Sequence, residues 1–147
     1  MSLTKNIDRK EFFAAMGISS AALALVCCVG CSASQAKGST TAAVIAGLNF
    51  TLDLNAPANA ALKANGGFIT SHNLIIARTS SGDYIAAQQA CTHQGFTLAY
   101  QSDDSQYMCS AHGSTFSEKG IVVNGPAAIN LATYKTALSG TSLRIFS

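Results

Sequence analysis

Charged residues are scarce in this sequence, because only 11% of its 147 residues are Asp, Glu, Lys or Arg. Hydrophobic residues make up 48% of the chain, a composition that excludes a disordered polar chain. The formal net charge is +2, and no run of Lys or Arg follows residue 30. The chain therefore lacks the clustered positive charge that binds nucleic acid, and we expect no nucleic-acid partner.

Helical periodicity and internal repeats are also lacking after residue 30. Short segments rich in β-branched and aromatic residues alternate there with clusters of Gly, Asp, Asn, Ser and Pro, as strands alternate with turns. We therefore expect an all-β domain over residues 43–147, a small antiparallel sandwich or barrel of roughly nine or ten strands. A second domain does not fit in a chain of this length. The expected strands include residues 50–54, 73–78, 84–87, 97–101, 106–109, 121–123, 134–138 and 142–146.

The first thirty residues have the features of a secretion signal. Lys5, Arg9 and Lys10 supply a positive start, and residues 12–30 are mostly apolar or small. Residues 8–13 are similar to a twin-arginine export motif with Lys in the second basic position. Such a leader places the domain outside the cytoplasm, at the periplasmic face of a bacterial membrane.

Cys31 lies at the expected end of this leader. Residues 29–31 read Val-Gly-Cys, which is similar to a bacterial lipobox, in which the cysteine thiol receives a lipid and becomes the new N-terminus. Cleavage by a different signal peptidase, or an uncleaved anchor helix of about 19 apolar residues, stays open as an alternative. We expect a signal peptide or membrane anchor over residues 1–30, lipidation at Cys31, and a flexible tether over residues 31–42.

Two short motifs in the domain combine cysteine with histidine. Cys91 and His93 form a C-x-H motif. After a gap of fifteen residues, Cys109 and His112 form a C-x-x-H motif. Two separated cysteines could form a disulfide, but a histidine close to each one favours metal binding. Two neutral imidazoles on one iron of a [2Fe-2S] cluster raise its reduction potential above that of an all-cysteine cluster.

Zinc is the competing metal, because tetrahedral sites with two cysteines and two histidines use the same ligand types. A zinc finger usually pairs cysteine with cysteine, whereas each cysteine here is paired with a histidine. A zinc-stabilised exported binding domain therefore stays open as an alternative. His72 has no ligand-like neighbours, and we expect it on the surface or in a turn.

Three segments carry a family resemblance: residues 91–95 (Cys-Thr-His-Gln-Gly), 109–114 (Cys-Ser-Ala-His-Gly-Ser) and 125–127 (Gly-Pro-Ala). Through them the sequence resembles the Rieske iron-sulfur protein family over most of residues 43–147. The resemblance implies a Rieske-type antiparallel fold with a small cluster-binding subdomain that includes residues 97–108. It also implies one [2Fe-2S] cluster, with one iron bound by both cysteines and the other by both histidines.

The resemblance implies roles for three further residues. Gly113 would let the second ligand loop turn tightly, and Pro126 would lie on a third loop that covers the cluster. Ser114 matches the position whose hydroxyl donates a hydrogen bond to a bridging sulfide, which stabilises the added electron.

Three positions depart from the Rieske proteins of quinol-oxidising cytochrome bc complexes. Phe96 and Ala111 stand where those proteins have further cysteines that form a disulfide beside the cluster. Phe116 stands where high-potential members have a tyrosine that donates a second hydrogen bond. We therefore expect an intermediate reduction potential, and a Rieske ferredoxin or periplasmic accessory subunit in preference to a bc subunit.

The resemblance implies one-electron transfer in an exported respiratory or periplasmic redox system, with a redox protein or a quinol as donor or acceptor. The alternatives are a small subunit of an arsenite-oxidase-type periplasmic oxidase and a subunit of a cytochrome bc complex. A Rieske oxygenase also needs a mononuclear iron bound by two histidines and a carboxylate. Only His72 remains once the cluster has taken two of the three histidines. We therefore expect an electron-transfer component without enzymatic activity of its own.

Overall fold

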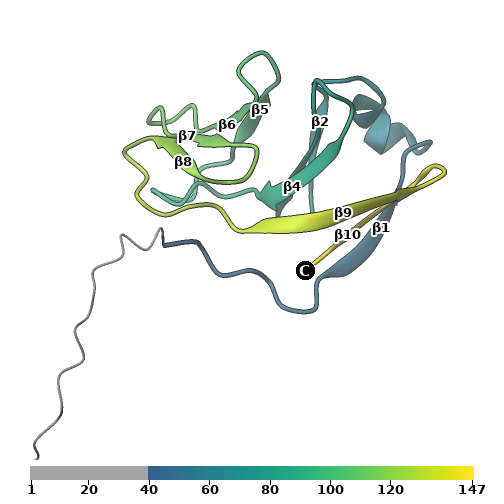
Figure 1. Ribbon diagram of the computed structural model, residues 1–147, viewed down its shortest axis with the longest axis horizontal. Helices are drawn as coiled ribbons and strands as arrows, with labels where there is room; N and C mark the ends of the chain where they lie inside the picture. Colours follow the sequence, from purple (N-terminus) through teal and green to yellow (C-terminus); the bar gives the residue numbers. More distant parts are fainter. Residues whose placement is uncertain (1–39) are drawn as a thin grey trace, which may run out of the picture. The chain divides into compact units, whose positions relative to one another are not determined.

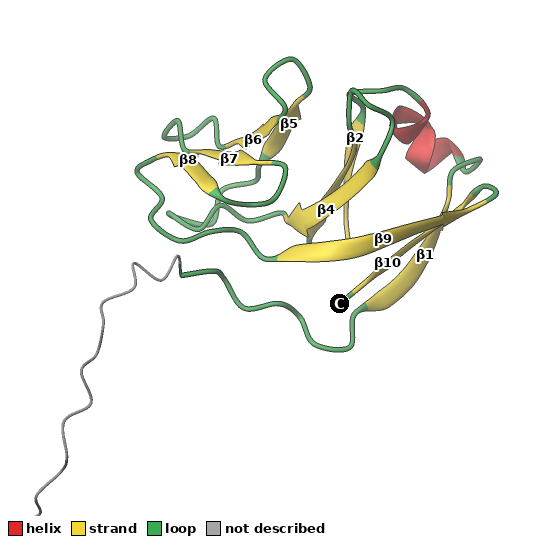
Figure 2. Ribbon diagram, viewed as in Figure 1, coloured by secondary structure: helices red, strands yellow, loops and turns green. Residues whose placement is uncertain are grey.

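The computed structural model describes residues 40–147, and the leader with Cys31 lies outside these residues. The described part contains ten strands and one short 3-10 helix, arranged as a six-stranded and a four-stranded antiparallel sheet. Figure 1 labels most of the strands, and Figure 2 shows how little helix accompanies them. The expected all-β fold is confirmed. No helix among the described residues has both the length and the apolar character to cross a membrane.

The six-stranded sheet has the strand order β1-β10-β9-β4-β3-β2. In β10, Leu143 and Ile145 are buried while Ser142 and Arg144 are exposed, which is the period of two expected for a strand with one face on a core. The bounds are β1 (Asn49–Asp53), β2 (Phe68–Ser71), β3 (Leu74–Arg78), β4 (Tyr84–Gln88), β9 (Thr133–Ser139) and β10 (Ser142–Phe146).

Strand β3 is buried on both faces and separates two hydrophobic cores. Leu74 and Ile76 pack into one core, together with side chains of β1, β4, β9 and β10. Ile75 and Ala77 point the other way, into a second core that contains Cys91 and Cys109. A strand with a core on each side needs a continuous apolar run, which explains why residues 74–77 do not alternate with polar ones.

The four-stranded sheet is inserted between β4 and β9 and has the order β5-β6-β7-β8. Tyr100, Tyr107 and Phe116 form its buried face against the second core. This sheet is the small subdomain that the resemblance implied, and it positions the cysteine and histidine motifs at its loops (Figure 1). Its strands are β5 (Ala99–Gln101), β6 (Gln106–Met108), β7 (Thr115–Ser117) and β8 (Val122–Asn124).

A 3-10 helix, η1 (Pro57–Lys63), connects β1 to β2 and was not expected from the sequence. Leu62 is its buried anchor, and the hydroxyl of Tyr84 donates a hydrogen bond to the Leu62 carbonyl at 3.1 Å. Gly67 follows the helix closely, and a Cβ atom there would lie 1.8 Å from the Ala61 carbonyl oxygen. The helix therefore packs against the chain that leads into β2 at a position that only glycine can occupy.

The first described residues are attached to the loop between β8 and β9. The Asn130 amide donates a hydrogen bond to the Thr40 carbonyl at 2.8 Å, and the Ala42 amide donates one to the Asn130 carbonyl at 2.9 Å. The Ile45 amide donates to the hydroxyl of Tyr134 at 3.1 Å. The end of the expected tether therefore pairs with the domain, at the loop that precedes β9.

Candidate metal centre

The two motifs lie on loops that share one backbone hydrogen-bond pattern. In the first loop, residues 89–98, the Cys91 amide donates to the Phe96 carbonyl and the Gly95 amide donates to the Cys91 carbonyl, both at 2.8 Å. In the second loop, residues 109–114, the amides of Cys109 and Gly113 make the equivalent bonds at 2.8 and 2.9 Å. Each turn is closed by two hydrogen bonds to the backbone of its own cysteine, so the two cysteine backbones are held in the same way.

A glycine four residues after each cysteine makes this turn possible. Gly95 and Gly113 have φ angles of 77° and 74°, in the left-handed region that a residue with a Cβ atom adopts only with strain. The resemblance assigned this role to Gly113 alone. The equal spacing from Cys91 to Gly95 and from Cys109 to Gly113 was visible in the sequence and could have identified both.

The four motif side chains meet as a buried pair of cysteines and an outer pair of histidines. Cys91 and Cys109 are 3% and 0% exposed, and both are free thiols. The rings of His93 and His112 lie 4.8 Å apart between centroids and at 87° to each other. His93 is half-buried and His112 is exposed, so the histidine pair faces solvent while the cysteine pair faces the core.

Burial raises the pKa of the Cys91 thiol above its ordinary value, and contact with the Cys109 thiol raises it further. A thiol in this position keeps its proton unless a cation stabilises the thiolate. Metal binding at Cys91 must therefore release a proton.

The donor set fits a two-iron cluster. The Nδ1 atom of His93 is buried and has no hydrogen-bond partner among the described residues, although buried ring nitrogens are normally satisfied. A metal ion on this nitrogen would satisfy it. No three His, Cys, Asp or Glu side chains in residues 40–147 converge on one ion position. A [2Fe-2S] cluster takes only two side chains per iron, so one cysteine pair and one histidine pair are sufficient.

A third loop, residues 125–132, covers both ligand loops. The hydroxyl of Thr92 donates to the Ile129 carbonyl at 2.6 Å, and the amide of Ala127 donates to the Ser114 hydroxyl oxygen at 3.0 Å. Pro126 lies on this loop, follows a cis peptide bond and is exposed. The loop therefore connects the first ligand loop to the second through side-chain hydroxyls.

Ser114 is fully buried beneath this third loop. Its oxygen already accepts a hydrogen bond from Ala127, and its hydroxyl hydrogen has no acceptor among the described residues. A hydroxyl both donates and accepts, so Ser114 has one donor available to the site. Phe116, two residues later, is also fully buried and has no hydroxyl to add.

Two tyrosines lie beneath the cysteines in the same core. The Tyr100 hydroxyl donates to Glu118 at 2.5 Å, whereas the Tyr107 hydroxyl is buried without a partner among the described residues. Burial raises the pKa of both phenols far above the ordinary value, and the Glu118 carboxylate adds to this effect at Tyr100. Both phenols therefore stay neutral at physiological pH and place no charge under the thiols.

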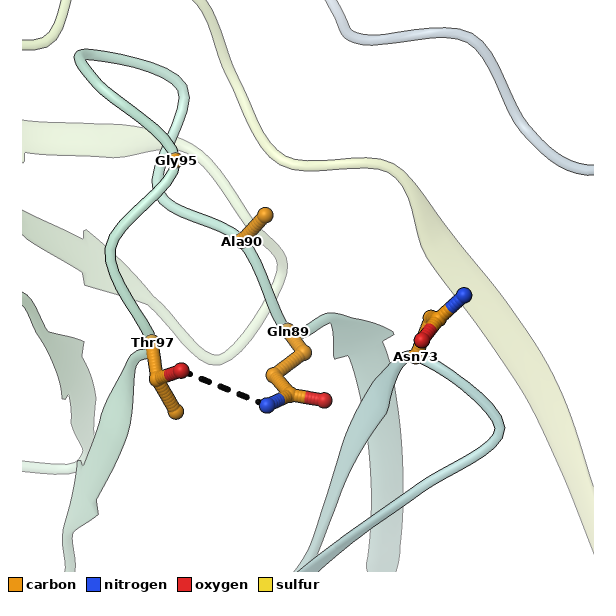
Figure 3. A pocket seen from close by; sticks show the side chains of 5 residues that line it. All are labelled: Asn73, Gln89, Ala90, Gly95 and Thr97. Atoms are coloured by element: carbon orange, nitrogen blue, oxygen red, sulfur yellow. Dashed lines mark hydrogen bonds between the residues drawn. The ribbon is translucent and has the colours of Figure 1, made fainter.

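The neck of the first ligand loop is closed by a short ladder. The Leu98 amide donates to the Gln89 carbonyl at 2.9 Å, and the Gln89 side-chain amide donates to the Thr97 hydroxyl at 3.3 Å. Figure 3 shows this side-chain bond, with Ala90 and Gly95 on the loop and Asn73 across a cavity of about 320 Å³. The ladder fixes the base of the loop that carries Cys91, where the loop joins strands β4 and β5.

The three loops carry no Asp, Glu, Lys or Arg residue, and their exposed large apolar side chains are Phe96 and Ile129. His72 lies far along the chain from them, exposed at the β2–β3 turn with a φ of 53° and stacked on Phe50 at 4.0 Å. The expectation that His72 is a surface turn residue is therefore confirmed.

Comparison with known proteins gives consistent matches. The family model for the Rieske [2Fe-2S] domain matches residues 56–135, which is more than half of the chain. The cytochrome b6-f complex iron-sulfur subunit of Microcystis aeruginosa is 30% identical over 96 residues, 54% of this chain and 54% of that protein. The corresponding subunit of Chlorobaculum thiosulfatiphilum is 30% identical over 78 residues, 53% of this chain and 43% of that protein. The chain spans about half the length of the curated relatives it matches.

Solved structures show the same fold. The cyanobacterial plasma membrane Rieske protein PetC3 from Synechocystis has a TM-score of 0.51 and 29% identity, covering 60% of this chain and 93% of that one. A ferredoxin from Sphingomonas yanoikuyae has a TM-score of 0.50 at 22% identity, covering 57% of this chain and 88% of that one. At that identity the second likeness concerns the fold alone.

Proposed function

This chain belongs to the Rieske [2Fe-2S] domain family, and from that premise we propose that four residues hold its cluster: Cys91, His93, Cys109 and His112. A domain of this family binds one [2Fe-2S] cluster and transfers electrons. The observation that carries the assignment is the pair of equivalent loops, which bring a buried cysteine pair and an outer histidine pair together. Both cysteines would bind one iron and both histidines the other.

The buried and the exposed residues around the cluster would have different roles. When bound, the cluster accepts and releases one electron. The buried cysteines hold it at the core, and the histidine edges at the surface shorten the path to a partner. The Ser114 hydroxyl would donate to a bridging sulfide, because its hydrogen has no acceptor among the described residues.

We propose one-electron transfer between a donor and an acceptor in a respiratory or periplasmic redox chain. The partner would meet an uncharged face made by the exposed edge of His112 with Phe96 and Ile129. A second candidate, a subunit of a quinol-oxidising cytochrome complex, is supported by the names of the relatives. Phe96 and Ala111 in place of the disulfide cysteines favour the carrier or accessory-subunit role.

A redox titration of the full chain tests this function. We expect one electron per chain and a midpoint potential below that of a cytochrome bc Rieske subunit measured in parallel, because Phe116 cannot donate the second hydrogen bond. A midpoint equal to that of the bc subunit would favour the second candidate.

We also propose that the domain is exported and anchored. The proposal combines a signal peptide or anchor at residues 1–30, a lipid on Cys31 and a tether over residues 31–42 ahead of the domain at 43–147. The likeness to a plasma membrane Rieske protein from Synechocystis supports membrane attachment.

Replacing Cys31 with alanine tests the lipoprotein assignment. Because the thiol would carry the lipid, we expect the Cys31→Ala variant to move from the membrane fraction to the soluble periplasmic fraction, with its cluster absorbance unchanged. Cys27, in the apolar part of the leader ahead of the lipobox, provides the matched control: Cys27→Ala should stay in the membrane fraction. If both variants remain there, the leader is an uncleaved anchor helix.

A further inference from the structure

Phe96 is a large aromatic side chain that stays 50% exposed at the metal centre. Its ring lies 5.5 Å from the ring of His112 between centroids, at an angle of 78°. This edge-to-face arrangement lies within the range that aromatic pairs prefer. The residue belongs to the first ligand loop and the histidine to the second, so the contact joins the two loops.

The backbone of Phe96 is fixed by a hydrogen bond that does not depend on this side-chain contact. Its carbonyl accepts the hydrogen bond from the Cys91 amide at 2.8 Å, so the turn that closes on Cys91 also sets the position of the Phe96 Cα atom. The next residue, Thr97, lies in the ladder at the neck of the loop. The Phe96 ring therefore contacts His112 from a backbone that hydrogen bonds hold in place.

His112 has little else to orient its ring. It is exposed, and its ring contacts among the described residues are with Phe96 and with His93. An exposed imidazole exchanges rotamers freely unless neighbouring rings restrict it. A ligand nitrogen must keep one direction to hold a metal, and groups around the ligand normally supply that restriction.

We propose that Phe96 is a positioning residue for His112, linking the two ligand loops without a covalent bond. This proposal rests on the proposed function, because it takes His112 as a cluster ligand. The ring holds the outer histidine by an edge-to-face contact. The requirement is for an aromatic ring, not only for apolar volume.

Three variants of the full chain separate this role from a general apolar contact. Phe96→Leu keeps apolar bulk and removes the ring, and Phe96→Tyr keeps the ring and adds a hydroxyl toward solvent. Val123→Ala changes another exposed apolar side chain, 63% exposed on β8, as a matched control. All three keep the backbone bond of residue 96 to Cys91, so the loop retains its turn.

The readouts are the rate of cluster loss to a ferrous chelator, followed by visible absorbance, and the EPR g-values of the reduced protein. We expect cluster loss in Phe96→Leu to be about 2- to 12-fold faster than in the wild type, since an aromatic pair is worth about 0.5–1.5 kcal/mol. Its g-values should shift, because the histidine direction changes. Phe96→Tyr and Val123→Ala should match the wild type in both measurements.

Equal behaviour of Phe96→Leu and Phe96→Tyr, or equal acceleration in Val123→Ala, would overturn the positioning role. Failure of the proposed function is distinguishable, because the wild type would then show no cluster absorbance or EPR signal. A wild-type signal with an unaffected Phe96→Leu variant removes only the role of Phe96.

Discussion

Replacing Cys109 with serine is expected to abolish cluster binding. Cys109 is 0% exposed at the head of the second ligand loop, so no water or neighbouring ligand can take its place. The iron that carries no histidine is held by thiolates, and a serine hydroxyl is a much weaker acid than a thiol and does not readily ionise to replace one. Iron and acid-labile sulfide in the purified full chain should fall to background, and the visible absorbance should disappear.

Ser110→Ala is the control for this change, because Ser110 is the next residue of the same loop but is exposed. It should keep the full iron and sulfide content. A Cys109→Ser variant that retains two irons per chain would show that the second loop is not a ligand loop.

Replacing Ser114 with alanine is expected to lower the reduction potential. Its hydroxyl is buried and has no acceptor for its hydrogen among residues 40–147, and a hydrogen bond from it to the sulfide would become stronger when an electron is added. Hydrogen bonds to charged groups exceed neutral ones by about 1 kcal/mol. Since a tenfold change in the equilibrium of a one-electron couple is about 59 mV, we expect a decrease on the order of 50 mV.

The same change leaves the buried amide of Ala127 without its acceptor. An unsatisfied buried donor costs about 1–3 kcal/mol, so thermal unfolding should also occur at a lower temperature. Ser110→Ala should alter neither the midpoint potential nor the unfolding temperature. A Ser114→Ala midpoint within error of the wild type would contradict the proposed bond to the sulfide.

The sequence predicted the parts of the fold that have a clear pattern. The last strand alternates buried and exposed residues in the sequence and in the structure, and the apolar run at residues 74–77 became the central strand β3. Strand β2 was missed because it has only four residues with no alternating burial. Strand β7 was missed because it has three residues directly after a ligand loop. Neither is long enough to establish a period.

For the metal centre, the sequence predicted the candidate ligands but not the contacts around them. The spacing of Cys91, His93, Cys109 and His112 predicted the four candidate ligands because each motif is local, and the structure places the two histidine rings 4.8 Å apart between centroids. The contact of Phe96 with His112 was not predictable, because it depends on how two loops approach each other in space. Tyr107 likewise falls in an expected strand, but the sequence does not show that its hydroxyl is buried without a partner among residues 40–147.

The most direct test of the two-iron site is metal and sulfide analysis of the purified full chain, combined with EPR after reduction by dithionite. Two irons, two labile sulfides and no zinc per chain, with an anisotropic signal that appears only on reduction, are the predicted result. A folded chain that contains zinc, or that takes up no iron and sulfide after anaerobic reconstitution, would contradict the assignment.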